Sequence, residues 1–347
     1  MSRRGWVLFA ALSLLWGIPY LMIRVAVEVF DPVVVAFGRT FLGALLLLPI
    51  ALYRRQLAPV FRRWRSLLLY TLVEIVGPWW LLGHAETRLD SSTAGLLVAM
   101  VPLIAAVILA VSGHDRFDVR RLLGLGIGFG GVAALVGFDV DLHDLGAVGS
   151  VVLTATGYAF GAYIIGHMLD DLPPLGVVTA SLMLSATIYL PFAIWLRPTH
   201  VTVPAVWSVI GLAVLCTAVA FLCIFALVAE AGPGRATVIT YINPAVAIAL
   251  GILVLHEPMT VGVGIGFPLV IVGAVLATAR SRTRGAPPDG PVAAPAEVAP
   301  SGAGSALGDP VPVLRAAGGA VLQPQVDHAV PGQVGQVPLR GRPADTD

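Results

Sequence analysis

The sequence contains no lysine and little charge of either sign. Charged residues occupy 12% of its 347 positions, and every basic one is an arginine. Soluble domains carry roughly twice this share of charge, whereas hydrophobic residues here reach 57%. The formal net charge of +1 argues against a nucleic-acid partner. The composition therefore predicts a membrane protein whose immediate surroundings are the lipid bilayer.

The sequence also lacks the motifs of common enzyme classes. Cys216 and Cys223 fall on one helical face but too far apart for a disulfide. There is no zinc or redox motif, and no Walker A loop, nucleophile elbow or H-E-x-x-H run. We expect no metal, no cofactor and no enzymatic activity. The alternative, a membrane-embedded enzyme acting on lipid, would need a cluster of nucleophiles or metal ligands at one depth, which the ionisable residues do not form.

Long apolar runs are what the sequence has in abundance. A helix needs about 20 mostly apolar residues to cross roughly 30 Å of hydrocarbon. No barrel-type alternation appears, so helices must satisfy the backbone in lipid. We predict an all-α integral membrane protein with ten transmembrane helices, at residues 6–27, 33–53, 66–83, 92–112, 120–138, 147–168, 174–196, 205–228, 235–255 and 261–279.

The arginines predict the orientation of these spans. With the N-terminus inside, the inner loops collect most of them, and the outer loops keep only Arg88 and Arg197. The inner loop with Asp170 and Asp171 has no arginine and is a local exception. The positive-inside rule therefore places both termini in the cytoplasm, with the chain in the cell membrane. The first run is longer than a signal-peptide core and lacks a cleavage site, so we expect it to be retained.

One stretch occurs twice without a gap, 142 positions apart. Pro102 and His114-Asp115 in the first copy match Pro244 and His256-Glu257 in the second. Such self-similarity indicates a duplicated half. Five spans per copy make the second copy enter from the opposite side, so the halves are two inverted five-helix repeats, a recurrent transporter design. We expect repeats at residues 1–138 and 147–280, and a disordered cytoplasmic tail at 285–347, which is rich in Pro, Ala and Gly.

Charge inside the spans is the sharpest functional signal. A charged side chain at the bilayer centre costs about 2.5–3.5 kcal/mol, so it usually faces a cavity or a partner. Arg39 and Glu74 lie at similar depths in neighbouring antiparallel spans, where an ion pair is feasible. One interpretation is a purely structural ion pair. The other is that one or both residues contact the substrate or a coupling proton, with Glu74 as the proton carrier. The second repeat has Ser181 and Cys216 at the equivalent positions.

Aromatic side chains surround these charges in the sequence. Aromatic walls with few polar groups suit a mostly organic substrate, although Trp80 fits an interfacial belt and His84 fits an ordinary polar helix end. We expect substrate contacts weighted to the first repeat, with Tyr158 and Asn243 as the second-repeat candidates. The predicted contacts are Trp16, Tyr20, Arg39, Glu74, Trp79, His84, Tyr158 and Asn243.

Prolines interrupt three of the spans. Pro78 removes the hydrogen bond to the Glu74 carbonyl and should kink its helix. Pro102 and Pro244 lie near the middle of their spans. The three are candidate hinges for movement between inward and outward states, and the alternative for each is a static kink.

Glycines and junction acids indicate packing and capping. Glycines in the fifth and tenth spans form small-xxx-small patterns that let helices approach closely, and a homodimer seam is the alternative. His114-Asp115 and His256-Glu257 lie at helix junctions, where acids interact with the positive end of a helix. We favour capping over metal binding, because two ligands are too few for a metal site.

Taken together, these motifs resemble the drug/metabolite transporter superfamily, specifically its ten-span EamA-type members. The resemblance covers about residues 6–279 and is carried by Trp16-Gly17, Arg39, Ser92-Thr93-Ala94-Gly95, Pro102, Tyr241-Ile242-Asn243-Pro244 and Leu255-His256-Glu257-Pro258. Asp115, where the family more often has Glu, and Gly157-Tyr158-Ala159, where Trp-Gly is usual, depart from it.

The resemblance implies a carrier that works by alternating access. It implies a central cavity lined by spans one to four and six to nine, with spans five and ten behind them, and substrates among amino acids, other metabolites and drugs. We therefore expect export of a small organic molecule, amino-acid-like or amphipathic. Without a nucleotide motif, energy must come from an ion or substrate gradient. Facilitated uptake is the alternative within transport, and a non-transporting anchor for partners is a third class.

Overall fold

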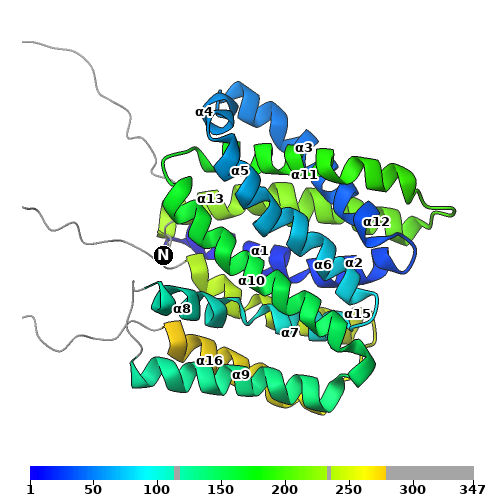
Figure 1. The fold of residues 1–347 in the computed structure, drawn as a ribbon, viewed down its shortest axis with the longest axis vertical. Helices are drawn as coiled ribbons and strands as arrows, with labels where there is room; N and C mark the ends of the chain where they lie inside the picture. Colours follow the sequence, from blue (N-terminus) through cyan, green and yellow to red (C-terminus); the bar gives the residue numbers. More distant parts are fainter. Residues whose placement is uncertain (113–117, 233–235, 279–347) are drawn as a thin grey trace, which may run out of the picture.

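We describe residues 1–112, 118–232 and 236–278 of a computed structural model. The chain is a bundle of helices that run roughly along one direction (Figure 1). The first repeat contains α1 Arg3–Gly17, α2 Pro19–Val27, α3 Pro32–Tyr53, α4 Leu57–Arg62, α5 Trp64–Tyr70, the π-helix η1 Thr71–Val76, α6 Gly77–Glu86, α7 Ser91–Val98, α8 Val101–Val111 and α9 Val119–Asp139.

The second repeat follows after a short 3₁₀ turn, η2 Leu142–Asp144. It contains α10 Leu145–Met168, α11 Pro174–Trp195, α12 Val203–Ala213, the π-helix η3 Val214–Val219, α13 Ala220–Ala231, the 3₁₀ helix η4 Thr237–Tyr241, α15 Asn243–Val254 and α16 Val261–Thr278. The predicted tail, the His114-Asp115 junction and the start of the predicted ninth span lie outside the described residues.

Most of the predicted spans are single long apolar helical segments. Within the described residues, nine segments are long and apolar enough to cross a bilayer, and Val238–Val254 is a shorter apolar helix in the place of the predicted ninth span. Three spans are interrupted rather than continuous: at Ile18 before Pro19, at Ala99–Met100 before Pro102, and at Ile242 before Pro244. The predicted bends at Pro102 and Pro244 are therefore present, whereas their use as hinges stays a prediction.

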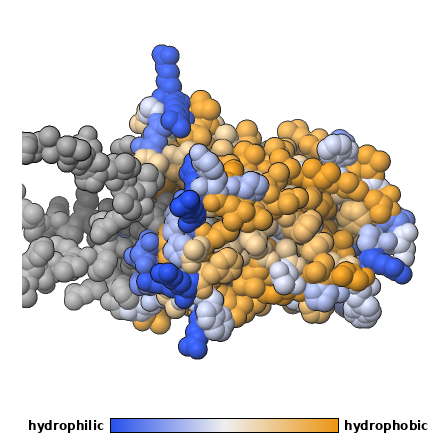
Figure 2. Space-filling model, turned by 90° about the horizontal axis from the view of Figure 1, so that it is seen from above, coloured by the Kyte–Doolittle hydropathy of each residue, from blue (hydrophilic) through white to orange (hydrophobic). Residues whose placement is uncertain are grey.

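The two ends of the bundle differ in charge. The end that carries the N-terminus, here called the N-terminal face, holds Arg3, Arg4 and the arginines that flank α4 and begin α9. The other end, here called the opposite face, holds the loops after α2, α6, α9, α11 and α15. In Figure 2 hydrophilic side chains gather toward the two ends, and the surface between them is apolar. Arg63 Nη2 lies 2.8 Å from Asp171 Oδ2, so a neighbouring loop supplies the positive charge that the Asp170-Asp171 loop lacks.

Helices α9 and α16 pack side by side at one edge of the bundle (Figure 1). A side chain at Gly124, Gly131, Gly266 or Gly273 would meet the backbone of the opposing helix at 3.0 Å or less. Of the glycines in the predicted pattern, Gly124 and Gly266 pack these two helices against each other. Gly126 and Gly130 have nothing within 4 Å among the described residues.

Candidate functional site

A cavity of about 380 Å³ lies between the two repeats. It is lined by side chains from α1, α2, α3, η1, α6, α7, α8, α10, η3, α13, η4 and α15, so both repeats contribute. All three span interruptions border it, which fits the rule that irregular backbone at membrane depth lines a cavity. Helices α9 and α16 contribute no lining residue, as the family resemblance implied, but neither does α11, the seventh span, which the resemblance placed among the lining spans. The lining residues are Trp16, Pro19, Tyr20, Arg39, Glu74, Ile75, Trp79, Leu82, Gly95, Val98, Ala99, Val101, Pro102, Tyr158, Ala162, Cys216, Phe221, Thr240, Asn243 and Pro244.

The lining follows the duplication seen in the sequence. Many lining residues have their counterpart, 142 positions later, in the lining as well. These pairs are Trp16 and Tyr158, Tyr20 and Ala162, Glu74 and Cys216, Trp79 and Phe221, Val98 and Thr240, Val101 and Asn243, and Pro102 and Pro244. The cavity therefore lies where the pseudo-twofold axis of the repeats passes. Arg39 breaks the pattern, because its counterpart Ser181 is buried in α11 and does not line the cavity.

Arg39 is held by groups from both repeats. Its Nε donates a 2.9 Å hydrogen bond to Thr217 Oγ1 in η3, and its Cζ lies 3.6 Å from the centroid of the Trp79 ring. Arg39 as a whole is only 8% exposed. A cation stacked on an aromatic face and bonded through one edge is fixed in orientation. Its Nη edge has no hydrogen bond or ion pair within the described residues.

Glu74 lies in the middle of η1 and packs against α10. A side chain at Gly161 would collide with the Glu74 carboxylate, so the glycine makes room for the acid. Glu74 Oε2 is buried and has no hydrogen-bond partner in the described part of the chain. The ion pair with Arg39 that the sequence allowed is not formed, because Arg39 is bonded to Thr217 and stacked on Trp79 instead. The cavity thus holds one guanidinium and one carboxyl group that are not bonded to each other.

The kink predicted at Pro78 is a π-helix. The Gly77 N–H bonds the Leu72 carbonyl, five residues back, and Pro78 then opens α6 at a position that needs no N–H. Two neighbours use the carbonyls at this junction: Tyr189 Oη donates to the Val76 carbonyl at 2.5 Å, and Thr154 Oγ1 donates to the Pro78 carbonyl at 3.3 Å. π-Helices occur frequently at functional sites, and this one carries Glu74 into the cavity. Pro78 itself does not line it.

The predicted aromatic and amide groups come together in the same cavity. Trp16 meets Phe221 edge to face, with ring centroids 6.3 Å apart. Asn243, with its amide turned to donate, lies 3.2 Å from the Ser13 carbonyl and 2.9 Å from the Ile239 carbonyl. Its nitrogen therefore ties α1 to the start of α15, and its oxygen is the group that can still accept a hydrogen bond.

His84 is the one predicted contact that the structure places elsewhere. It is exposed near the end of α6, at the opposite face, and stacks on Trp80 with ring centroids 6.0 Å apart. This position agrees with the alternative that the sequence left open for His84, an ordinary polar helix end. Within the described residues, no group of three or more His, Cys, Asp or Glu side chains is placed to hold a metal ion.

At the opposite face, two acids bind helix starts in the other repeat. Glu257 accepts hydrogen bonds from the Ser91 and Ser92 N–H groups of α7, at 2.8 and 3.0 Å. Asp139 accepts from Gly262 and Val263 of α16, at 3.0 and 2.9 Å. The prediction that Glu257 acts as a cap is confirmed, but it caps α7, and Asp139 caps the helix that follows Glu257.

Two further acids near this face escaped the sequence reasoning. The carboxylate oxygens of Glu86 are buried without a partner among the described residues, and its carbonyl accepts from Arg24 Nη1 at 2.7 Å. Burial raises the pKa of the Asp90 carboxyl, and the nearby Glu257 charge raises it further. Both residues follow the end of a span, where sequence patterns indicate only a polar loop.

Comparison with known proteins places this arrangement in a family. The chain is 26% identical over 294 residues to the uncharacterized transporter YvbV of Bacillus subtilis, covering 82% of this chain and 94% of that protein. It is 28% identical over 250 residues to the uncharacterized inner membrane transporter YedA of Escherichia coli K12, covering 70% and 79%. A protein crystal structure, 17% identical, aligns with 79% of this chain and 96% of its own at a TM-score of 0.56, which shows a shared fold.

The model of the EamA-like transporter family matches this chain twice, at residues 3–137 and 145–279. The resemblance inferred from the motifs is therefore confirmed, as is the all-helical fold with two repeats. The family comprises transporters rather than enzymes, in agreement with the absence of catalytic motifs. This multi-pass membrane protein belongs to the EamA-like transporter family, with one family domain in each repeat.

Proposed function

We propose that the protein is a secondary transporter that exports a small organic metabolite or drug by alternating access. The observation that carries the proposal is the cavity between the repeats, where apolar and aromatic walls surround one guanidinium and one carboxylate that are not paired with each other. A mostly apolar cavity with a few placed polar groups suits a small organic ligand. A ligand with an aromatic or aliphatic body and a charged end, such as an amino acid, matches these walls.

In this proposal Arg39 binds the substrate and Glu74 carries the coupling proton. The Nη edge of Arg39 binds an acidic group of the substrate, because Thr217 and Trp79 hold the rest of the guanidinium. Glu74 carries the coupling proton, because its carboxylate borders the cavity with one oxygen unpartnered. Protonation of Glu74 when substrate leaves would couple export to proton entry. Trp16, Tyr20, Trp79 and Tyr158 form the apolar walls.

The direction of transport rests on the orientation of the chain. Arginines gather at the N-terminal face, and the positive-inside rule then puts both termini in the cytoplasm of the cell. On this orientation α7 and α15 pack extensively against each other on the outer side, whereas α8 and η4, the inner halves of the same two spans, make no contact of similar extent within the described residues. That packing favours cytoplasmic loading and export.

The test is flux in liposomes that contain the purified protein. A panel of amino acids and of cationic and neutral drugs is offered with and without a pH gradient of each sign. We expect substrate to move against its gradient when protons flow the other way, and the E74Q variant to lose this response. Flux that ignores the pH gradient and runs only down the substrate gradient would favour facilitated uptake. No flux of any compound above that of empty liposomes would contradict a transport role.

A further inference from the structure

The Glu257 carboxylate joins the two repeats at the opposite face. It sits in the loop between α15 and α16 and accepts from two backbone N–H groups and the Ser92 hydroxyl at the start of α7. These donors are the unsatisfied N–H groups of a helix start, which carry partial positive charge. Ser91 is fully buried and Ser92 is 3% exposed, so solvent competes little for them.

The backbone around Glu257 is arranged to hold this contact. His256 has a φ of 57°, in the left-handed region that non-glycine residues rarely occupy. The Glu257 N–H then returns to the Gly251 carbonyl at 3.1 Å. Gly251 lies directly against the contact, because a side chain there would collide with Glu257 and with the Ser92 hydroxyl. The turn thus aims one carboxylate at the start of α7, where Gly251 of α15 lies against it.

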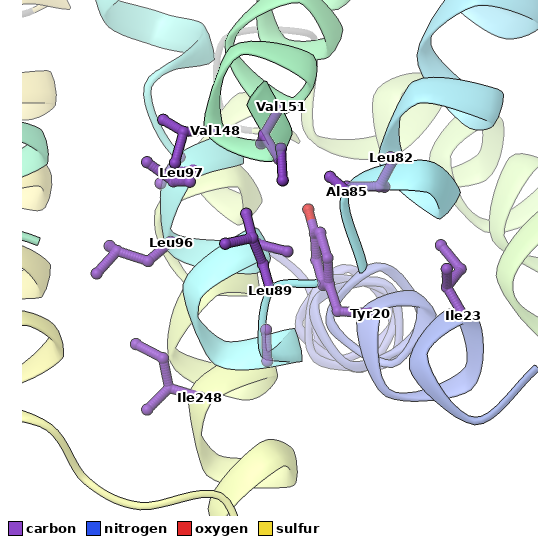
Figure 3. Close-up of a cluster of buried hydrophobic side chains, with 14 of the residues drawn as sticks. Tyr20, Ile23, Leu82, Ala85, Leu89, Leu96, Leu97, Val148, Val151 and Ile248 are labelled. Atoms are coloured by element: carbon purple, nitrogen blue, oxygen red, sulfur yellow. The ribbon is translucent and has the colours of Figure 1, made fainter. Parts of the chain in front are cut away.

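Beneath this contact, an apolar cluster separates the cavity from the opposite face. Tyr20 and Leu82 belong to both the cavity lining and the cluster. Figure 3 shows part of this cluster, with Tyr20, Leu82, Leu89 and Val151 close together. The cluster also includes Ile23, Ala85, Leu96, Leu97 and Ile248. A substrate leaving the cavity toward the opposite face must part these side chains, and therefore α7 from α15.

The repeat supplies a comparison for this closure. Helices α7 and α15 are the opposite-face halves of spans four and nine, and they pack extensively against each other. The other halves of the same spans, α8 and η4, make no contact of similar extent within the described residues. The structure is therefore closed by spans four and nine at the opposite face and less so at the N-terminal face.

We propose that Glu257 is a latch that holds the opposite face closed and must leave the start of α7 before the cavity can open toward that face. The proposal rests on the transport function proposed above and adds a gating residue outside the cavity. Release of the latch exposes two N–H groups and a carboxylate to water, and reclosure restores their hydrogen bonds. The latch therefore shifts the equilibrium between the states that are closed and open at the opposite face, without contacting substrate.

Asp139 provides a matched control. It is a half-buried carboxylate that also joins the repeats, accepting from two backbone N–H groups of α16 and from the Thr260 hydroxyl. Its helices, α9 and α16, line no part of the cavity. Loss of either cap costs a similar set of bonds, so a difference in cavity access between the two variants reports the latch and not general loosening.

The native Cys216 lines the cavity and serves as the reporter. In a C223A background, a membrane-impermeant maleimide is applied to intact cells and to inverted membrane vesicles, and the rate of Cys216 labelling is measured. A D141C marker, in a background lacking both native cysteines, identifies the preparation that exposes the opposite face. We expect E257A to raise Cys216 labelling from that face about tenfold, equal to about 1.4 kcal/mol, S92A to raise it less, and D139A to leave it at the parental rate.

Equal labelling in E257A and the parent, with D141C labelled normally, would overturn the latch, and so would an equal rise in D139A. If E257A is not recovered as a monodisperse protein, S92A decides, because it removes one donor and keeps the carboxylate: an increase supports the latch and no increase overturns it. The labelling needs no substrate. A parent that carries no compound therefore contradicts the proposed function, while its labelling still decides the latch.

Discussion

Each repeat places a π-helix in its third span, η1 at Thr71–Val76 and η3 at Val214–Val219. In the first, Glu74 faces the cavity and Pro78 follows. In the second, the equivalent positions are Cys216 and Ala220. Since η3 forms without a proline, Pro78 is not required for a π-helix at this place. The irregular backbone is a property of the repeated frame, whereas the charge it presents belongs to one copy.

The same division applies to Arg39. Its counterpart Ser181 is a small buried residue, but the hydroxyl that orients Arg39 comes from Thr217, in the π-helix of the second repeat. One repeat thus supplies the charges and the other supplies part of their support. Because the charges lie in one repeat only, a pseudo-symmetric frame that opens alternately to two sides can hold an asymmetric ligand in one orientation. Equivalent substitutions in the two repeats should therefore have unequal effects on transport.

Removal of the Glu74 charge is expected to have the largest effect. E74Q keeps the shape of the side chain but cannot exchange a proton, so uphill flux driven by a pH gradient should fall to the level of empty liposomes. Substrate exchange without a gradient should persist, because exchange needs no net proton transfer. The measurement is paired uptake and exchange in liposomes. A gradient response equal to that of the wild type would show that Glu74 is not the coupling group. The control is C216A, at the equivalent position in the second repeat, which should lose much less of the gradient-driven flux.

Truncation of Arg39 is expected to come next. R39A removes the cation that would bind an acidic substrate group, and loss of one partner of a buried charge pair costs about 2–5 kcal/mol, or on the order of 30-fold or more in apparent affinity. R39K keeps the charge but not the planar fork, so it should be intermediate. S181A, at the equivalent position, is the control. Equal effects of R39A and S181A on substrate affinity would contradict the asymmetry.

The sequence predicted the frame well, because the frame follows from local patterns. Apolar runs set the spans, and the glycine spacing of α9 and α16 identified a close contact that backbone geometry imposes. The 142-residue offset indicated two inverted repeats, and the family resemblance implied the central cavity, where pairs such as Pro102 and Pro244 do meet. Seven of the eight predicted contact residues border that cavity, and His84 does not.

Contacts between the repeats could not be predicted in the same way. Thr217 bonding Arg39 and Glu257 capping α7 join residues 178 and 165 or more positions apart, and no periodicity relates them. The π-helix was missed because its signal, a proline after Glu74, is shared with an ordinary kink and absent from η3. Arg39 and Glu74 both border the cavity, but which neighbour each contacts depended on side chains from the other repeat.

A smaller effect is expected where the second repeat supports the first. T217V keeps the size of the side chain but removes the acceptor for Arg39 Nε. A hydrogen bond to a charged group contributes about 1.5–3 kcal/mol, so apparent substrate affinity should fall by roughly tenfold or more, with little change in maximal rate. T179V removes a buried hydroxyl that bonds only the Leu175 carbonyl in its own helix, and should leave affinity unchanged. Equal losses in the two variants would indicate a packing defect.

The smallest effects are expected where the repeats are alike. Pro102 and Pro244 each open the second half of an interrupted span at the cavity. An alanine at either position can donate the missing backbone hydrogen bond, which straightens the span and makes bending costlier. P102A and P244A should each lower the maximal flux by about threefold, with similar affinity. The double variant should lower it by roughly the product, because distant sites usually act independently.

If both single variants transport at the wild-type rate, the interruptions are static kinks. If only one is impaired, the two halves of the frame do not move alike, and the asymmetry of the charges extends to the motion itself.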